Sequence, residues 1–437
     1  MAYNEKQQFK SRRTTLMGQI SDGAIIIGAS HNSPRNNDVD YEFRQNSTFW
    51  YLTGFDEPDA VLVLRPHHKD QCVIFVNPYD PQFEIWVGAR LGVDAAPENL
   101  DIDAAYPISE LDDQLPRLLE DIETIHYSIG SDSKLDDLMM NLVQKRRGLS
   151  QRGGVHLLRI EDPKPAIDRM RLIKSKAEIE LVQSAIDVTR VGFENAMRVT
   201  KPGTFEYQVQ AEMKSHFRKL GSVRNGYPSI VASGTNSCIL HYINNREQLK
   251  DGDLLLIDAG AEYDYYTADI TRTWPVNGRF TPEQKEVYEI VLASQSAGIK
   301  AISPGIEFNE VHIASLRILV QGLIDLGAVE GSIDGLIESR AYLPYYMHGT
   351  SHWLGLDVHD AGPYRDDERS ITLEEGMVFT VEPGLYFGNQ ATESPENLKG
   401  IGIRIEDNVV VTAEGYSVLS DTILSSISDI EELVGTV

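Results

Sequence analysis

Short apolar runs alternate with helical patterns over the first 160 or so residues of the chain. Four runs are typical of buried strands, at residues 24–27, 60–64, 72–76 and 124–129. Residues 111–119 and 135–145 instead repeat apolar side chains at the period of a helix. Strands and helices in this alternation predict an α/β domain.

An aromatic-rich stretch, residues 41–55, stands out in this domain. We favour the interpretation that it forms a corner of the core. The alternative is a surface that faces a substrate or another subunit. Trp86, in a short stretch of its own, admits the same two interpretations.

A second domain is expected after a proline-containing linker at residues 159–171. Ser175 and Glu178 form a capping box, in which each side chain satisfies a free backbone amide at the start of a helix. A chain of 437 residues is also too long for one ordinary core. We therefore predict an N-terminal domain at residues 1–172 and a second domain at 173–437.

The second domain contains an internal repeat. A Pro-Gly turn that opens an amphipathic helix occurs at residues 201–209 and again at 303–311, and each copy follows a long helix. Thr281 and Gln284 form another capping box at the start of the second long helix. Strand-rich sequence follows each copy, which predicts two helix-helix-sheet halves that form one curved sheet with helices outside. Ligands often bind where two such halves meet.

Two carboxylates follow the strand-like sequence of the first half. The apolar run 254–257 ends on Asp258, and Asp269 opens another strand-like run. Gly260 and the polar turn after it predict a hairpin that carries both carboxylates. Buried carboxylates close together repel each other and are poorly solvated, so one takes up a proton unless a cation intervenes. A divalent metal is one such cation; solvated turn residues are the alternative.

The second half supplies more polar residues of the same kind. Glu382 ends an apolar run before a Pro-Gly turn, and Arg404 and Glu406 share one face of an alternating strand, where a structural salt bridge is the alternative. Three histidines lie within residues 348–359: His348, His352 and His359. Glycines around them argue against a zinc-protease helix of the His-Glu-x-x-His type.

The composition of the chain bears on its partners and its location in the cell. A formal net charge of −26 argues against nucleic acid or an anionic membrane as a partner. With only two cysteines, Cys72 and Cys238, there is no disulfide framework. The first residues lack the apolar core of a signal peptide, and no apolar run approaches the length of a membrane span. We expect a cytoplasmic protein.

The four carboxylates and one histidine form an oxygen-rich ligand set: Asp258, Asp269, Glu382, Glu406 and one of the histidines. Four negative charges balance two divalent cations. Such a set suits Mn²⁺, Co²⁺ or Mg²⁺, and Zn²⁺ is also possible. Two metal ions lower the pKa of a bridging water and stabilise a hydrolytic transition state. The residues therefore indicate metal-assisted hydrolysis.

The motifs also identify a family. The order Asp258, Asp269, His352, Glu382, Glu406, the sequence around His348–His359, and the Glu-Pro-Gly-Leu-Tyr that begins at Glu382 resemble the pita-bread metallopeptidases. The resemblance is to bacterial aminopeptidase P (Xaa-Pro aminopeptidase). It covers nearly the whole chain and includes residues 44–55 and 84–86. It implies an α/β N-terminal domain for substrate restriction and oligomerisation, before a catalytic α+β pita-bread domain.

The resemblance implies a role for each site residue. Asp269 and Glu406 would bind both of two metal ions, preferably Mn²⁺, while Asp258 would hold one ion and His352 with Glu382 the other. His241 would lie in the substrate pocket, and His348 and His359 would bind substrate and stabilise the transition state. Tyr386 and Arg404 match further active-site residues of the family. Arg152 matches another one if the alignment is shifted by one residue. The resemblance further implies a homo-oligomer, a tetramer or a dimer, in which the N-terminal domain of one chain borders another chain's active site. Trp86 would be a contact there and, with Arg152, a substrate-binding residue.

The implied reaction releases the N-terminal residue from peptides with proline at the second position. A hydroxide held by the two metals would attack the scissile carbonyl, and Glu382 would pass the proton to the prolyl nitrogen. His359 would stabilise the negative oxygen. The nearest alternative is a prolidase restricted to Xaa-Pro dipeptides, with phosphotriester hydrolysis as a side activity. A creatinase-like enzyme or a non-enzymatic binding protein would require missing metal ligands, and all five positions are filled.

Overall fold

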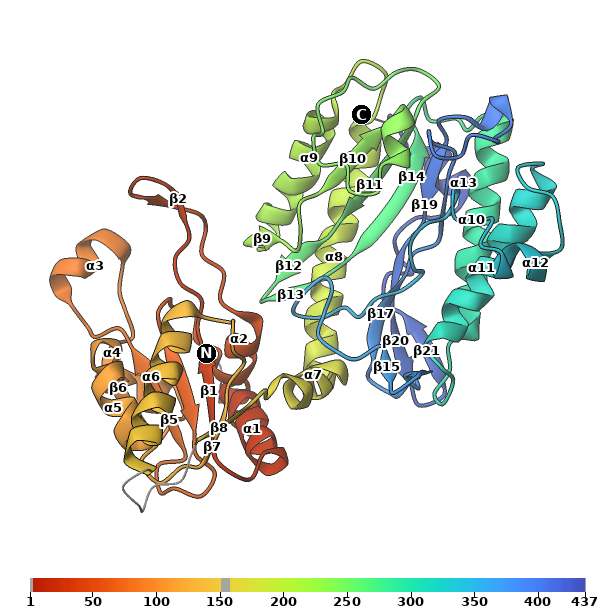
Figure 1. Cartoon of the computed structure of the whole chain (residues 1–437). Helices are drawn as coiled ribbons and strands as arrows, with labels where there is room; N and C mark the ends of the chain where they lie inside the picture. The colour runs from red at the N-terminus through yellow and green to blue at the C-terminus, as the bar shows by residue number, and fades with distance from the viewer. Residues whose placement is uncertain (1–2, 151–157, 437) are drawn as a thin grey trace. The chain divides into compact units, whose positions relative to one another are not determined.

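A computed structural model describes residues 3–150 and 158–436 of the chain (Figure 1). The described chain forms two compact units that divide between Met170 and Arg171. This division lies close to the boundary expected at residue 172. Each unit has its own sheet and core.

The first unit is an α/β domain built on a six-stranded sheet with the strand order β6-β5-β4-β1-β7-β8. Its strands are β1 (Ala24–Gly28), β4 (Val61–Leu64), β5 (Cys72–Val76), β6 (Ala104–Pro107), β7 (Thr124–His126) and β8 (Arg159–Glu161), with a separate hairpin of β2 (Pro34–Asn36) and β3 (Val39–Asp40). Its helices are α1 (Tyr3–Gln19), α2 (Ser47–Thr53), α3 (Pro81–Val87), α4 (Gly92–Leu100), α5 (Leu111–Leu118) and α6 (Ser133–Ser150), and α7 (Lys164–Leu172) crosses the division. The strands and helices predicted from the apolar pattern are present, although β7 ends at His126 and not at residue 129. The expected linker at residues 159–171 instead contains β8, which pairs with β7, and most of α7.

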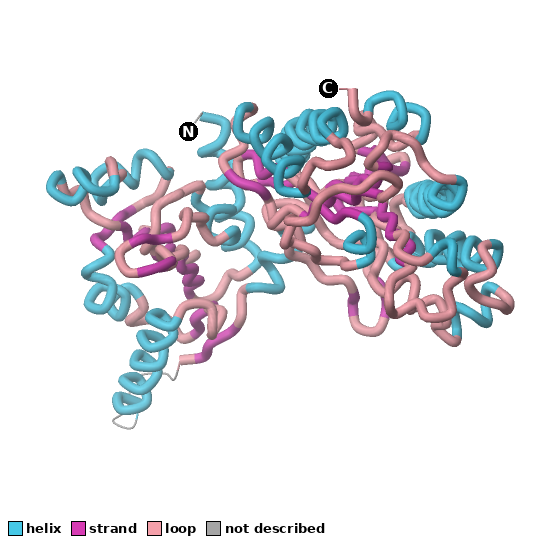
Figure 2. Tube along the Cα trace, turned by 90° about the horizontal axis from the view of Figure 1, so that it is seen from above, coloured by secondary structure: helices cyan, strands magenta, loops and turns pink. Residues whose placement is uncertain are grey.

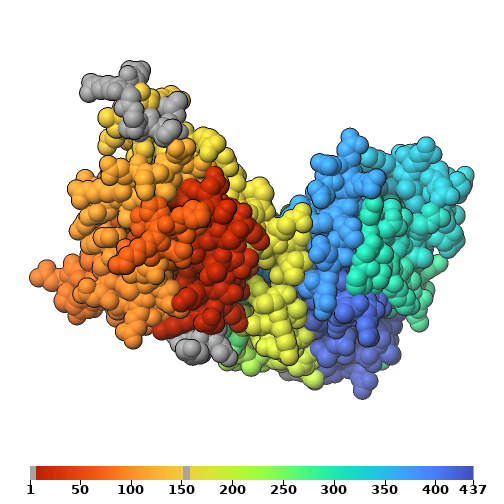
Figure 3. Space-filling model, turned by 90° about the horizontal axis from the view of Figure 1, so that it is seen from below, coloured from red at the N-terminus to blue at the C-terminus, as the bar shows by residue number. Residues whose placement is uncertain are grey.

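The aromatic stretch at residues 41–55 divides between core and surface. Helix α2 buries Phe49 and Leu52 completely, so the core interpretation is right for its centre. Tyr41, at the hairpin, is 61% exposed. On α3, which projects from the body of its unit (Figures 1 and 3), Trp86 is 85% exposed and Ile85 81%. Trp86 is therefore a surface residue of this chain.

The second unit contains the two helix pairs expected from the repeat. These are α8 (Lys176–Val199) with α9 (Glu206–Lys219), and α10 (Pro282–Ala301) with α11 (Asn309–Asp325). Both predicted capping boxes are present, at the starts of α8 and α10. The helices lie on the outside of the strands (Figure 2). Two short helices, α12 (Ile333–Glu338) and α13 (Ile427–Leu433), complete the set in the described residues.

Each half contributes antiparallel strands. The first half has β9 (Arg224–Asn225), β10 (Ile230–Ser233), β11 (Leu254–Ala259), β12 (Ala261–Tyr263), β13 (Tyr266–Thr267) and β14 (Ile270–Pro275). The second has β15 (Arg365–Asp366), β16 (Arg369–Ser370), β17 (Val378–Val381), β18 (Gly384–Tyr386), β19 (Gly402–Arg404), β20 (Asp407–Thr412) and β21 (Gly415–Val418). β14 is the edge strand in the order β10-β11-β14, and β20 is the central strand in the order β17-β20-β21. The halves meet where Thr271 of β14 pairs with Glu406, the residue just before β20. No helix in the described part of the chain is long and apolar enough to cross a membrane.

Candidate active site

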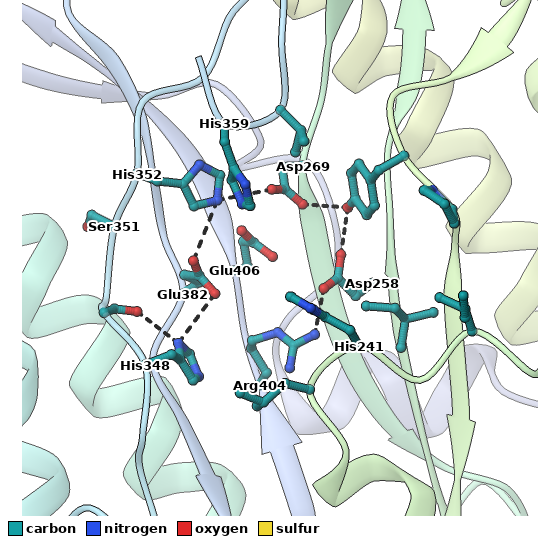
Figure 4. A pocket seen from close by; sticks show the side chains of 17 residues that line it. His241, Asp258, Asp269, His348, Ser351, His352, His359, Glu382, Arg404 and Glu406 are labelled. Carbon is teal, nitrogen blue, oxygen red and sulfur yellow. Dashed lines mark hydrogen bonds and ion pairs between the residues drawn. The ribbon is translucent and has the colours of Figure 1, made fainter. Parts of the chain in front are cut away.

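A cavity of about 530 Å³ opens between the two halves of the second unit. Its lining comes from both halves: Tyr227, Pro228, Ile230, Leu240, His241, Ile243, Asp258 and Asp269 from the first, and His348, Gly349, Ser351, His352, Val358, His359, Glu382, Arg404 and Glu406 from the second. Figure 4 shows the labelled carboxylates and His352 directed toward a shared space. The structure thus brings together every predicted metal ligand.

The first half supplies two carboxylates on the predicted hairpin. Strands β11 and β14 pair so that Asp258 lies opposite Thr271, and Asp269 lies just before β14. The two arms of the hairpin approach closely at Gly260, where a Cβ atom would lie 1.7 Å from the carbonyl oxygen of Ala268. The hydroxyl of Tyr227 donates to Asp258 Oδ1 at 2.6 Å and also hydrogen-bonds Asp269. The hairpin and this tyrosine together hold the two carboxylates side by side.

The second half supplies His352 and Glu382 from neighbouring backbone segments. His352 lies in a loop beside β17, and Glu382 follows that strand directly. The amide of Glu382 donates to the carbonyl of Thr350 at 2.8 Å, which holds the strand end against the histidine loop. His352 Nε2 lies 3.5 Å from Glu382 Oε1 and 3.3 Å from Asp269 Oδ2. One imidazole nitrogen therefore faces carboxylates of both halves.

Glu406 sits between β19 and β20, where the halves meet. Its Oε2 accepts a hydrogen bond from Thr271 Oγ1 at 2.6 Å. Its Oε1 is buried and has no hydrogen-bond partner among the described residues. Ligand atoms of Asp269, His352 and Glu406 all lie within 4.8 Å of one another. A buried carboxylate oxygen left without a donor costs free energy, so this position suits a cation.

Burial and crowding perturb the acid–base chemistry of this cluster. In the chain without metal, burial raises the pKa of Glu382 to about 7 and that of Asp269 above its ordinary value. Burial, reinforced by the charges of Asp269 and Glu382, raises the pKa of Glu406 strongly. Burial lowers the pKa of His352, but the hydrogen bond to Asp269 and the charge of Glu382 outweigh it and raise that pKa to about 9. The residues fit a divalent metal, because a metal would replace the protons that these carboxyls otherwise require.

A hydrogen-bonded network borders the cluster. Arg404 is buried and donates to Asp258 Oδ2 at 2.5 Å and to the Tyr386 hydroxyl at 3.0 Å. That hydroxyl lies 2.8 Å from His348 Nε2. Burial, with the charge of Arg404, lowers the pKa of His348 to about 3, which keeps its imidazole neutral. Tyr386 does not line the cavity itself but connects two residues that do.

The remaining predicted residues fall into three groups. His241 and His359 line the cavity, and the rings of His352 and His359 pack edge to face at 4.4 Å. Trp86 belongs to the first unit, and the cavity lining belongs to the second. Arg152 lies outside the described residues, so its predicted role stays a prediction.

Sequence reasoning missed two residues that contact the carboxylates. Tyr227 bonds both Asp258 and Asp269, and Thr271 bonds Glu406. Thr271 lies two residues after Asp269, so strand alternation could have placed it on the same face. Tyr227 precedes a proline in a polar turn, and nothing in its local sequence distinguishes it.

Comparison with known proteins agrees with this site. The model of metallopeptidase family M24 matches residues 180–413, and that of the aminopeptidase P N-terminal domain matches residues 9–126. The chain is 43% identical to a Xaa-Pro aminopeptidase of Haemophilus influenzae, covering 99% of this chain and 98% of the relative. The solved structure of Pseudomonas aeruginosa aminopeptidase PepP has a TM-score of 0.95 at 42% identity, covering 98% of this chain and 97% of that one. A structure of zinc-substituted Escherichia coli aminopeptidase P with product has a TM-score of 0.94 at 43% identity and covers 98% of each chain. The chain therefore belongs to the aminopeptidase P group of metallopeptidase family M24.

Proposed function

We propose that this chain is a metal-dependent aminopeptidase that releases the N-terminal residue from peptides with proline at the second position. The observation that carries the proposal is the cluster of four carboxylates and His352 around one cavity, with Glu406 Oε1 buried and unpartnered in the described structure. The names of the relatives at 43% identity support the substrate class.

The ligand set supports two divalent ions, for which we propose Mn²⁺. Asp269 and Glu406 would hold both ions, Asp258 one, and His352 with Glu382 the other. Oxygen donors of this kind suit Mn²⁺ and Co²⁺, and Zn²⁺ is also compatible with them. When bound, the ions would supply a Lewis acid that activates water and polarises the scissile carbonyl.

The side chains around the cavity would carry the proton transfers. Glu382 would accept the proton of the attacking water and deliver it to the prolyl nitrogen, which has no hydrogen of its own in the peptide. His359 would donate to the carbonyl oxygen as it becomes negative. His348 is held by the Tyr386 hydroxyl and lies 3.6 Å from Glu382, so it would position substrate beside the base.

The apolar part of the cavity supports a pocket for the proline ring. Leu240, Ile243 and Val358 line it together with His241. A pyrrolidine ring buries apolar surface against such side chains without leaving an unpaired amide N–H. We assign this wall, with His241, to the prolyl residue.

The surface of the first unit supports assembly into a homo-oligomer, which we propose to be a tetramer. Helix α3 exposes Phe83, Ile85, Trp86 and Val87. Apolar side chains gathered on a projecting helix are typical of a contact between subunits. Cys72 and Cys238 are free thiols, which supports a cytoplasmic location.

The test is cleavage of Xaa-Pro-Yaa, Xaa-Pro and Xaa-Ala-Yaa peptides by metal-stripped protein before and after Mn²⁺ is added. Cleavage of Xaa-Pro-Yaa only after Mn²⁺ is restored, with Xaa-Ala-Yaa left intact, is the expected result. Activity that survives complete metal removal would overturn the mechanism. Cleavage restricted to the dipeptide would indicate a prolidase instead.

A further inference from the structure

An isolated backbone bridge joins strand β14 of the first half of the second unit to the second half. Thr271 of β14 pairs antiparallel with Glu406, whose amide donates to the Thr271 carbonyl at 3.1 Å. In an antiparallel pair, the residue two positions after one partner lies opposite the residue two positions before the other. The partners on either side of this pair are therefore Thr273 with Arg404, and Asp269 with Asn408.

Side chains replace the backbone hydrogen bonds at both of these flanking pairs. Thr273 Oγ1 donates to the carbonyl of Arg404 at 3.0 Å and accepts from its amide at 3.3 Å. Asn408 does the same for Asp269: its Nδ2 donates to the Asp269 carbonyl at 2.5 Å, and its Oδ1 accepts from the Asp269 amide at 3.0 Å. Both side chains are completely buried.

The two hydrogen bonds from Asn408 reach Asp269 at a point where its backbone is not paired within a strand. Asp269 lies between β13 and β14, and the pairing of β11 with β14 ends at Ile270. Both polar groups of its backbone are bonded to one planar amide, which fixes the peptide planes on either side of its Cα atom. These planes set the direction of the Cα–Cβ bond from which the Asp269 carboxylate extends.

The backbone of Asn408 is held in turn by the neighbouring strand β17. Asn408 is opposite Thr380 in the pairing of β20 with β17. Thr380 in turn accepts from the amide of His352 at 3.1 Å and donates its own amide to the His352 carbonyl at 3.0 Å. His352, Thr380, Asn408 and Asp269 thus form one row across the sheet. The row ends in a predicted metal ligand on each side.

We propose that Asn408 is a positioning residue for the metal centre: its amide sets the position of Asp269 relative to Glu406 and His352, and so the spacing of the two metal ions. This inference rests on the metal site of the proposed function. Asn408 would bind no metal and touch no substrate. It acts through the backbone of Asp269 alone.

Asn245 offers a matched control. It is 3% exposed, its Oδ1 accepts from the Val231 amide at 3.0 Å, and its Nδ2 donates to the Ser229 carbonyl at 2.8 Å. Asn245→Ala therefore removes the same type of buried two-way backbone contact, but from Ser229 and Val231, neither of which is one of the five predicted ligands. Asn408→Ala and Asn245→Ala should lose comparable amounts of stability.

The experiment measures Mn²⁺ binding to folded, metal-stripped protein by calorimetry, together with the electron paramagnetic resonance signal of an exchange-coupled Mn²⁺ pair. Substitutions that disturb the support of a metal ligand typically weaken metal binding by about 10- to 100-fold. We expect a loss of that size in Asn408→Ala, with a weaker coupled signal at equal Mn²⁺ loading. Asn245→Ala should keep the wild-type affinity and signal.

Each other outcome has a distinct meaning. Wild-type affinity and coupling in Asn408→Ala, or an equal loss in Asn245→Ala, would overturn the role of Asn408 and leave the metal site intact. Wild-type protein that binds no Mn²⁺ would overturn the proposed function itself. If Asn408→Ala is unfolded at the assay temperature, Asn408→Thr, which suits a strand but has no amide, is measured with the same expectation.

Discussion

The buried ion pairs of Asp360, which follows the loop that carries His348, His352 and His359 (residues 348–359), can be tested directly. Its carboxylate is buried and forms ion pairs with Arg171 and, at 2.8 Å, with Lys174, both of which are also buried. Arg171 keeps a second partner, the half-exposed Asp357, at 2.8 Å. Lys174 would lose its carboxylate partner in Asp360→Asn, and the uncompensated ammonium would remain in the interior.

The expected loss is about 3 kcal/mol of unfolding free energy. Removing one partner of a buried ion pair costs roughly 3–5 kcal/mol, and the remaining contact from Asp357 to Arg171 places this case at the lower end. For a unit of this size, 1 kcal/mol lowers the melting temperature by roughly 2–4 °C, so a decrease of about 6–12 °C should follow. Because the chain has two units, hydrogen exchange of peptides from residues 353–360 would report the local effect.

The pH dependence of this loss has a definite sign. Burial would raise the pKa of Asp360, but the charges of Lys174 and Arg171 outweigh it and hold the pKa below 3.8. A carboxyl with a depressed folded-state pKa contributes stability above its unfolded pKa and loses that contribution as the pH falls through the folded value. The difference between wild type and Asp360→Asn should therefore be complete at neutral pH and narrow below pH 3.8.

Two controls distinguish the loss of stability that is due to the buried charge from the loss that any substitution would cause. Asp334→Asn removes the partner of Arg317 in an exposed pair at 2.6 Å and should cost less than about 1 kcal/mol. Asp360→Leu combined with Lys174→Met should recover part of the loss, because it removes both charges. An Asp360→Asn protein as stable as Asp334→Asn would refute the reasoning, since the buried lysine would then need no partner.

Two further predictions concern the pocket wall and the assembly. Glu206 is completely buried and accepts hydrogen bonds from Tyr242, from the amide of Glu247 and from Ser233, so Glu206→Ala should loosen the loop that carries His241. It should raise KM for Xaa-Pro-Yaa by about tenfold, and His241→Ala should have the same effect, with metal content unchanged by elemental analysis in both variants. Loss of metal would contradict this role. Trp86→Ala should lower the mass measured by light scattering at micromolar concentration, whereas Ile129→Ala, which truncates another exposed apolar side chain of the same unit, should not. An unchanged mass in Trp86→Ala would exclude α3 as the contact.

The amino-acid sequence by itself determined the features that depend on neighbouring residues. Capping boxes placed the starts of α8 and α10 because their hydrogen bonds join residues three positions apart. The Asp258–Asp269 hairpin followed from an apolar run, a glycine and a polar turn. The carboxylates and histidines of the cluster could be selected because each stands at the end of, or within, an apolar segment, where a charged group requires a partner.

Only the tertiary structure decided which distant residues support these groups. Asn408 is 139 residues from Asp269, and Arg404 is 146 residues from Asp258. Such contacts depend on how the two halves of the repeat pack, and an isolated Asn in a strand has the same local pattern whether or not it bonds a distant backbone. The exposure of Trp86 was likewise open in the sequence, because an aromatic residue in a short helix suits a core or a surface equally well until packing is known.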